Sequence, residues 1–151
     1  MAAGTWNAWK RAKLEIGQGR IDLSTRELRI TLHSVGASAN LGANVDITTL
    51  ASVGSELAAT RGYAANGKTI SAGAWALSGT DAVYSGSGVF WSANGGNLGS
   101  GTVKYAVIHA SEAGGTRFPM FYVTLTSTPV LVANGSRVTI NNGGAIYFKL
   151  T

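Results

Sequence analysis

Length, composition and charge indicate a single domain with a polar but weakly charged surface. The 151 residues are 45% hydrophobic, which excludes a disordered chain. They include no cysteine, which excludes disulfides and thiolate metal sites. Only 13% of the residues are charged, against about 25% in an average soluble domain, and 21 are glycine. Such a composition suits a protein that packs against neighbours, although a solvated β-domain with uncharged polar loops would share it.

The net charge of +5 is concentrated near the N-terminus, where half of the basic residues lie within the first 29 positions. Acidic residues are interleaved with them, so the single-sign stripe typical of nucleic-acid binding is missing. An acidic protein neighbour is therefore a more plausible partner than nucleic acid. No apolar run is long enough for a membrane span and no signal peptide is visible, so we expect no membrane association.

Residues 1–18 form the first predicted unit, an N-terminal arm that is helical or extended. Apolar residues up to Ile16 recur at helical spacing, and Gly17 and Gly19 end the pattern. A helix this short needs a packing partner, which is either the core of the same chain or a neighbouring subunit. The candidate contact residues of this arm are Trp6, Trp9, Lys10, Arg11 and Lys13.

Short strands separated by turn residues are predicted for the rest of the chain. Residues 28–32 alternate between apolar and polar side chains, the pattern of a half-buried strand. Residues 45–57 are expected to be mostly irregular with a helical turn, and a short helix capped by Asp46 is the alternative. Further strands are expected at 68–70, 75–77, 82–85, 88–91, 103–109, 120–126, 129–132, 137–140 and 145–150.

Turn chemistry completes the prediction of the fold. Asn66-Gly67 favours a type I′ hairpin turn, and Ala133-Asn-Gly-Ser136 is the clearest hairpin signal between two strands. Turns that recur about every 8–12 residues are typical of all-β sandwiches and barrels. We therefore predict an all-β, single-domain antiparallel β-sandwich, jelly-roll or immunoglobulin-like, over residues 19–151, with about 8–10 short strands.

Residues that could carry out chemistry do not form a known catalytic or metal-binding pattern. His33 and His109 have no ligand at metal-site spacing, and we expect both to be surface or strand-end residues. The seven acidic residues form no local cluster, and Gly95-Gly96 matches no phosphate-loop motif. We expect a protein that is not an enzyme and that needs no cofactor or metal.

Adjacent aromatic residues suggest contact surfaces instead. The pairs Phe90-Trp91, Phe121-Tyr122 and Tyr147-Phe148 each fall in a predicted strand, where neighbouring side chains point to opposite faces. One member of each pair should enter the core, and the other is available for an interface, where aromatic residues are enriched. The candidate interface residues of this group are Trp91, Phe121, Tyr122 and Tyr147.

Several motifs in order along the chain resemble those of a family of small virion proteins of tailed bacteriophages. The longest is Gly19-Arg-Ile-Asp-Leu-Ser-Thr-Arg-Glu-Leu-Arg-Ile-Thr-Leu32, and the resemblance extends to Thr151. Asn66 departs from a glycine of the family pattern, and His109 departs from an aromatic residue. The remaining motifs are Tyr63-Ala-Ala-Asn-Gly-Lys68, Val89-Phe-Trp-Ser92, Ala106-Val-Ile-His109, Val138-Thr-Ile140 and Gly143-Gly-Ala-Ile-Tyr-Phe-Lys-Leu150.

The resemblance implies a structural role in the virion, assembled in the cytoplasm of the bacterial host. The expected function is that of a capsid decoration (cement) protein, a homo-oligomer that binds the major capsid protein and stabilises the shell. A tail, collar or baseplate protein, including one that attaches a fibre, is the alternative. A carbohydrate-binding module for host recognition, with Trp75, Trp91 or Tyr122 as stacking platforms, is the third hypothesis.

Overall fold

The computed structural model describes residues 5–42, 44–111, 115–140 and 146–150. Over these ranges the chain is mostly β-structure, and all of its paired strands are antiparallel, as the strand pattern predicted. No described helix is long and apolar enough to cross a membrane. The elements in order are β1 (Asn7–Ala8), α1 (Lys10–Gly17), β2 (Leu28–His33), η1 (Val35–Asn40), α2 (Leu50–Val53), β3 (Lys68–Thr69), β4 (Ala74–Ser78), β5 (Asp81–Ser85), β6 (Val89–Ser92), η2 (Leu98–Ser100), β7 (Thr102–Val103), β8 (Tyr105–Ser111), β9 (Arg117–Thr124), β10 (Val130–Leu131), β11 (Arg137–Ile140) and β12 (Ile146–Leu150).

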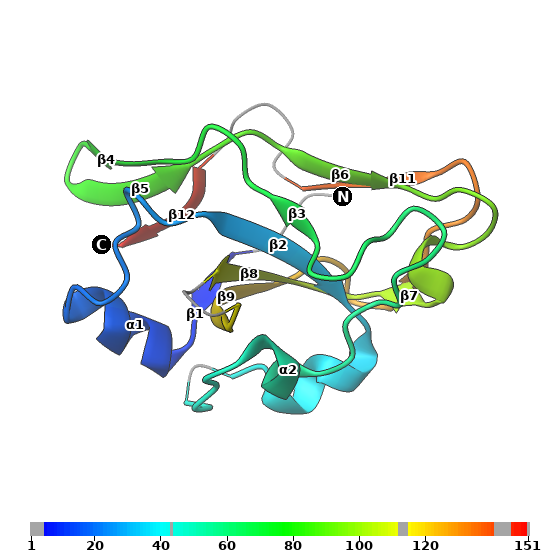
Figure 1. Ribbon diagram of the computed structural model, residues 1–151, viewed down its shortest axis with the longest axis horizontal. Coiled ribbons are helices and arrows are strands. Elements are labelled where there is room, and N and C mark those ends of the chain that lie inside the picture. The colour runs from blue at the N-terminus through cyan, green and yellow to red at the C-terminus, as the bar shows by residue number, and fades with distance from the viewer. Residues whose placement is uncertain (1–4, 43, 112–114, 141–145, 151) are drawn as a thin grey trace.

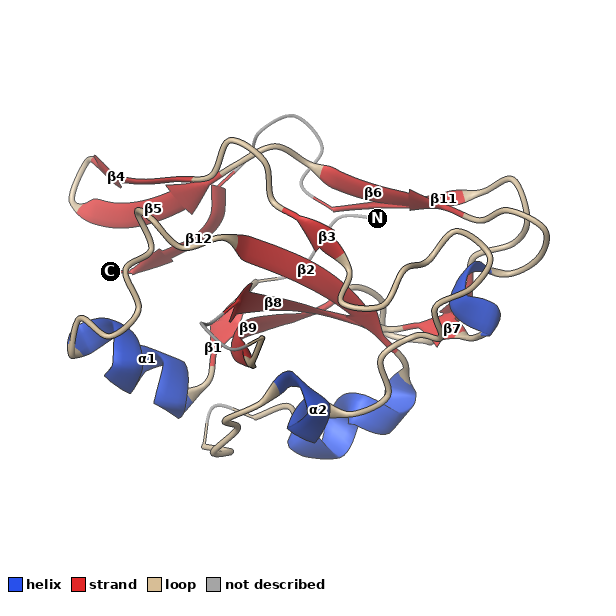
Figure 2. Ribbon diagram, in the orientation of Figure 1, coloured by secondary structure: helices blue, strands red, loops and turns tan. Residues whose placement is uncertain are grey.

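The elements form three layers around a five-stranded central sheet of order β1-β9-β8-β2-β3. Figure 1 shows the sheets β12-β5-β4 and β11-β6 above the central sheet, and helices α1 and α2 below it. Figure 2 shows that loops make most of the connections between these layers. The central sheet is therefore covered on both faces, which explains why every residue of β8 from Tyr105 to Ala110 is buried.

The main hydrophobic core lies between the central sheet and the two smaller sheets. Strand β2 contributes Leu28, Ile30 and Leu32 to it, which are the alternate residues of a strand and therefore share one face. Trp91 of β6 and Tyr84 of β5 contribute from the layer above. The predicted strand and its apolar face are thus confirmed, but the strand is not half-buried, because Thr31 on its other face is also fully buried.

A second, smaller core lies on the opposite face of the central sheet, against the helices. Its members are Trp9, Ala37, Ile47, Leu50, Val53, Tyr105 and Val107. Helix α2 is a single turn whose first backbone groups are capped by the Thr49 hydroxyl, which accepts a hydrogen bond from Ser52 N. The prediction of an irregular segment with one helical turn is confirmed, and Asp46 is not the cap.

The N-terminal segment packs within its own chain over its described part. Strand β1 pairs with β9, and Trp9 N donates a hydrogen bond to the Met120 carbonyl at 3.2 Å. The Trp9 side chain is fully buried, packs against Tyr122 with 4.8 Å between ring centroids and ring planes tilted by 47°, and donates from Nε1 to the Asn40 carbonyl. Residues 7–17 therefore belong to the same folded unit as the strands that follow.

Two of the predicted hairpins form turns but do not join paired strands. The Ser136 N to Ala133 O hydrogen bond closes the predicted turn, yet β10 pairs with β7 and β11 pairs with β6. The hairpin prediction at 133–136 is therefore wrong, because the two flanking strands diverge into different sheets. At Asn66-Gly67 both residues have positive φ as expected, but β3 pairs with the distant β2.

Strand β9 differs from its predicted extent. It begins at Arg117 rather than after Pro119, and Pro119 lies opposite His109 where the pairing with β8 shifts register. Such an irregularity tolerates a residue that has no backbone N–H to donate. Conversely, the predicted strand 103–109 is divided into β7 and β8 at Lys104, whose N–H bonds the His33 carbonyl.

Candidate binding site on the central sheet

Polar side chains gather on the helix-side face of the central sheet, beyond the end of the second core. The strand register places Arg29 of β2 opposite His109 of β8, and Ser111 of β8 opposite Arg117 of β9. His109 and Ser111 are two residues apart in one strand, so they share a face with Val107 of the second core. This face is therefore apolar under the helices and polar beside them.

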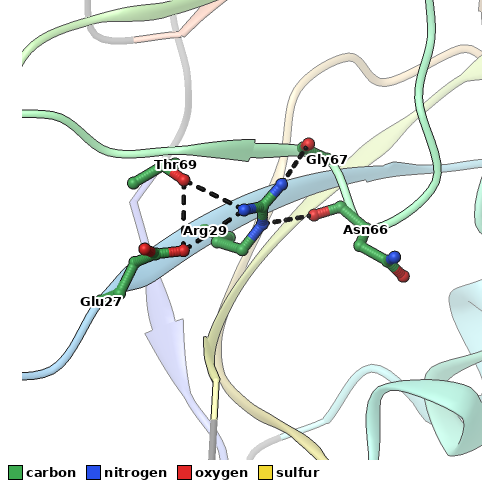
Figure 3. A network of polar contacts seen from close by, with 5 residues as sticks. All are labelled: Glu27, Arg29, Asn66, Gly67 and Thr69. Atoms are coloured by element: carbon green, nitrogen blue, oxygen red, sulfur yellow. Dashed lines mark hydrogen bonds and ion pairs between the residues drawn. The ribbon is translucent and has the colours of Figure 1, made fainter. Parts of the chain in front are cut away.

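Arg29 is the best-connected side chain of this polar region (Figure 3). Its Nε and Nη2 donate to the carbonyls of Asn66 and Gly67, both at 3.0 Å. Its Nη1 donates to the Thr69 hydroxyl at 3.1 Å and pairs with Glu27 Oε1 at 3.3 Å. Arg29 therefore holds the loop before β3 against β2 with the forked donor geometry that only arginine offers.

The same loop is fixed from its other side by Glu56. One carboxylate oxygen, Oε1, accepts from the Tyr63 hydroxyl at 2.8 Å and from Asn66 N at 2.7 Å. The Tyr63 hydroxyl also accepts from Leu32 N, which links this loop to β2. Burial, followed by the nearby Glu56 charge, raises the pKa of Tyr63, so its hydroxyl remains a donor.

His33 is the last residue of β2, as the strand-end alternative predicted, but it is fully buried, so the surface alternative is wrong. Its Nδ1 lies 2.7 Å from the Gly54 carbonyl and its Nε2 lies 2.9 Å from the Thr31 hydroxyl. Because a carbonyl only accepts, Nδ1 carries the proton and Nε2 accepts from Thr31. Burial lowers the pKa of His33, so the neutral ring is part of the folded structure.

His109 is also fully buried, so the surface prediction is wrong for it as well. Unlike His33, neither ring nitrogen of His109 has a hydrogen-bond partner of good geometry among the described residues. Burial lowers the pKa of His109 to about 4, and the positive charges of Arg117 and Arg29 act in the same direction. The nearby Asn66 carbonyl opposes this shift only in part.

A hollow of about 250 Å³ is lined in part by Arg29, which lies opposite this histidine in the sheet, and by Ser111, two residues further along β8; we call it the Arg117 hollow. The guanidinium of Arg117 has no ion pair or hydrogen bond to any other described residue, whereas those of Arg26 and Arg29 have partners. Sequence reasoning missed this site. The sequence feature that could have revealed the site is the presence of polar residues at alternate positions in 29–33 and 109–111. The residues that line the hollow are Arg29, Asn66, Ser111, Gly115 and Arg117.

None of the predicted contact residues of the N-terminal segment lines this hollow, and they do not form one exposed surface. Trp6 is partly buried against the main core, while Trp9 lies in the second core. Arg11 pairs with the buried Glu15 at 2.9 Å. Only Lys10 and Lys13 of this set are exposed, so the segment does not present its tryptophans as an open surface.

The aromatic pairs alternate as expected, but the outward member is not always the predicted one. In β6, Trp91 is fully buried and Phe90 is 48% exposed, so a contact role requires Phe90 rather than Trp91. In β9, Phe121 is buried and Tyr122 is partly exposed beside Trp9. Tyr147 lies in β12, but its side chain falls outside the described residues.

Metal-ligating side chains do not cluster in the part of the chain that the structure describes: no three histidine or acidic residues there could hold one ion. The arrangement that the structure does offer is a set of hydrogen-bond donors and positive charges beside an unpaired buried imidazole. Comparison of this chain with protein-family models, with curated proteins and with solved structures found no match.

Proposed function

We propose that this chain is a structural protein of a tailed-bacteriophage virion, a capsid decoration protein that associates with further copies of itself and with the major capsid protein. The ordered resemblance from Gly19 to Thr151 supports the virion role. The layered arrangement of antiparallel sheets supports the more specific fold, a β-sandwich, on which such a role would be built.

The observation that carries self-association is strand β4, which lies at the edge of the sheet β12-β5-β4. Its sequence, Ala-Trp-Ala-Leu-Ser, contains no charge, and four of its five residues are exposed, Leu77 by 81%. An edge strand leaves backbone N–H and C=O groups unpaired on its outer side, and proteins that stay monomeric usually protect it with charges or proline. Strand β4 has neither protection.

A second copy of this chain is the partner that fits this edge. Two β4 strands can pair antiparallel around a twofold axis, because each offers the same uncharged sequence to the other. The net charge of +5 is carried by other parts of the molecule, so no like charges meet within the paired strands. Burial of two Leu77 side chains would add apolar area to the backbone hydrogen bonds.

The test replaces Leu77 by lysine, which is a natural protection of edge strands. Sedimentation equilibrium should show concentration-dependent association of the wild-type chain and at least about tenfold weaker association of Leu77→Lys. Leu14→Lys is the matched control, because Leu14 is also exposed but lies on α1, away from the edge. Equal association of wild type and Leu77→Lys would overturn the role of β4.

A second experiment addresses the place of the protein in the virion. Quantitative mass spectrometry of purified particles should find this chain in amounts comparable to those of the major capsid protein. The purified chain should also bind expanded capsids that lack tails. Recovery only in purified tails would contradict decoration and favour the tail, collar or baseplate alternative.

The carbohydrate-binding alternative has weaker support. Trp91 is buried and Tyr122 packs on Trp9, so neither offers a free ring face for a sugar. Trp75 is partly exposed and borders an open hollow of about 360 Å³ together with Asp22 and Leu23. A saturable change in tryptophan fluorescence with host polysaccharide, lost in Trp75→Ala, would favour this alternative over decoration.

A further inference from the structure

The Arg117 hollow combines positive charge with unused hydrogen-bond donors from neighbouring strands. Arg117 has no partner among the described residues, and one N–H of Arg29 Nη2 is likewise left without one. A third guanidinium, that of Arg26, reaches the backbone carbonyl of Ser111 at 3.5 Å. Two acidic side chains of the described residues, Glu27 and Glu56, reach this region and already have partners. Glu27 binds Arg29 and Thr69, and Glu56 binds Tyr63 and Asn66.

The unpaired imidazole of His109 is an independent sign that a ligand completes this site. A buried polar group without a hydrogen bond destabilises a fold by about 1–3 kcal/mol, so such groups are rare unless something else satisfies them. His109 shares its face of β8 with Ser111, and Arg29 and Arg117, which border the hollow, act on it electrostatically. The hollow is therefore lined by residues that flank His109, and a ligand bound there would supply the hydrogen bond that this ring lacks.

We propose that the Arg117 hollow binds a phosphate group, held by the guanidinium of Arg117, the remaining N–H of Arg29 and the Ser111 hydroxyl, with His109 donating from below. Donors that come from three strands suit the tetrahedral oxygens of phosphate better than the planar oxygens of a carboxylate, for which one forked arginine is enough. The overall positive charge of the chain favours the approach of such an anion. This site does not depend on the virion role proposed above.

Calorimetric titration of the full chain with inorganic phosphate, at pH 7 and constant ionic strength, tests the proposal. We expect saturable binding to the wild type and at least about tenfold weaker binding to Arg117→Gln. Arg137→Gln is the matched control, because it removes the same charge from an exposed residue of β11 that lies over Phe90. Absence of saturable binding, or equal losses in the two variants, would overturn the proposal.

A second variant guards against a folding defect in Arg117→Gln. Ser111→Ala removes a single hydroxyl that has no hydrogen-bond partner among the described residues. It should weaken phosphate binding by about threefold to tenfold while leaving the circular dichroism spectrum unchanged. Unchanged affinity in Ser111→Ala would contradict the proposed donor set.

The histidine gives a readout that nonspecific charge attraction would not produce. Phosphate at saturation should raise the pKa of His109 from about 4, since a nearby negative charge favours the protonated ring and offsets the positive charges of Arg117 and Arg29. Nuclear magnetic resonance of the two imidazoles, assigned with His109→Asn, measures this shift. An unchanged pKa of His109 would overturn the placement of phosphate above this ring.

Three ligands distinguish the sources of the phosphate group. Inorganic phosphate, ribose 5-phosphate and acetate are titrated under the same conditions. Tighter binding of ribose 5-phosphate would assign the site to a phosphate monoester, and tighter binding of inorganic phosphate would assign it to the free ion; either supports the proposal. Acetate binding as tight as that of both phosphates would overturn the assignment to phosphate.

Discussion

The two histidines show how one residue type can have opposite hydrogen-bond environments on the same sheet face. His33 has a partner for each ring nitrogen, whereas His109 has none among the described residues. Both are buried, and burial lowers the pKa of each below the ordinary value of 6.5. The neutral ring is thus favoured in the folded protein, and protonation favours the unfolded chain.

The stability of the protein should therefore fall as the pH falls. Between pH 6.5 and the folded pKa of His109, about 4, the unfolded chain binds more protons than the folded one. Above pH 6.5 the two neutral histidines make their full contribution to the free energy of unfolding. Below pH 6.5 this contribution decreases by up to about 1.4 kcal/mol per pH unit for each histidine. Urea unfolding at pH 7.5, 6.0 and 5.0 measures this dependence.

Replacement of each histidine by leucine separates the two contributions. His109→Leu removes an unpaired polar group, so the free energy of unfolding at pH 7.5 should fall by no more than about 1 kcal/mol and depend less on pH. His33→Leu removes two hydrogen bonds and should lose roughly 1–3 kcal/mol already at pH 7.5. A pH dependence of His109→Leu as steep as that of the wild type would contradict this account.

At the scale of elements, the turn before β3 depends on a close approach that only glycine permits. Gly67 has a φ of +62°, and a Cβ at this position would lie 1.7 Å from the Ile30 carbonyl oxygen of β2. Gly79, in the turn between β4 and β5, has a similar φ of +64° but no atom within 4 Å of the same position. The two glycines thus share a backbone conformation and differ in surroundings.

Alanine at these two glycines should therefore have unequal effects. Gly79→Ala is expected to lower the free energy of unfolding by about 1 kcal/mol, which is the cost of positive φ alone. Gly67→Ala should cost at least about 2 kcal/mol more, because the added methyl group forces β3 away from β2. Chemical denaturation of both variants measures the difference, and equal losses would show that the contact with β2 is unimportant.

The N-terminal segment should be necessary for folding, since Trp9 fills the second core. Trp9→Ala is expected to lower the free energy of unfolding by about 3–5 kcal/mol and to reduce the near-ultraviolet circular dichroism signal. Leu14→Ala on the same helix is the control and should change stability by no more than about 0.5 kcal/mol, because Leu14 is exposed. A native-like spectrum and stability for Trp9→Ala would instead show that this segment is dispensable.

At the scale of the whole molecule, the two cores share the strands of the central sheet. Strand β8 places Ala106, Ile108 and Ala110 in the main core and Tyr105 and Val107 in the second one. Loss of this strand would expose both cores at once. The described layers are therefore expected to unfold as one unit rather than one after the other.

A single unfolding transition is the corresponding prediction. Far-ultraviolet circular dichroism and tryptophan fluorescence should give the same urea midpoint, because Trp9 and Trp91 report on different cores of one cooperative structure. An earlier fluorescence transition that is absent in Trp9→Phe would show that the helical side unfolds separately.

The sequence by itself determined the local features of this protein. Alternation in residues 28–32 identified a strand and its apolar face, because side chains in a strand point to opposite sides in turn. The strands predicted at 75–77 and 82–85 are present as β4 and β5, since short strands bounded by turn residues follow local preferences. The single helical turn at Leu50–Val53 was also evident from local pattern.

Only the tertiary structure decided the partners of the strands and the surroundings of the polar residues. The turn at 133–136 forms locally, but β11 pairs with β6 because the packing of Val138 and Trp91 in the main core outweighs the preference for its neighbour β10. The sequence predicted His109 to be a surface or strand-end residue. Arg29 and Arg117 lie 88 positions apart in the chain, so no local pattern connects them. Strand pairing brings them together around one hollow, and such pairing depends on contacts between distant segments that local sequence patterns do not encode.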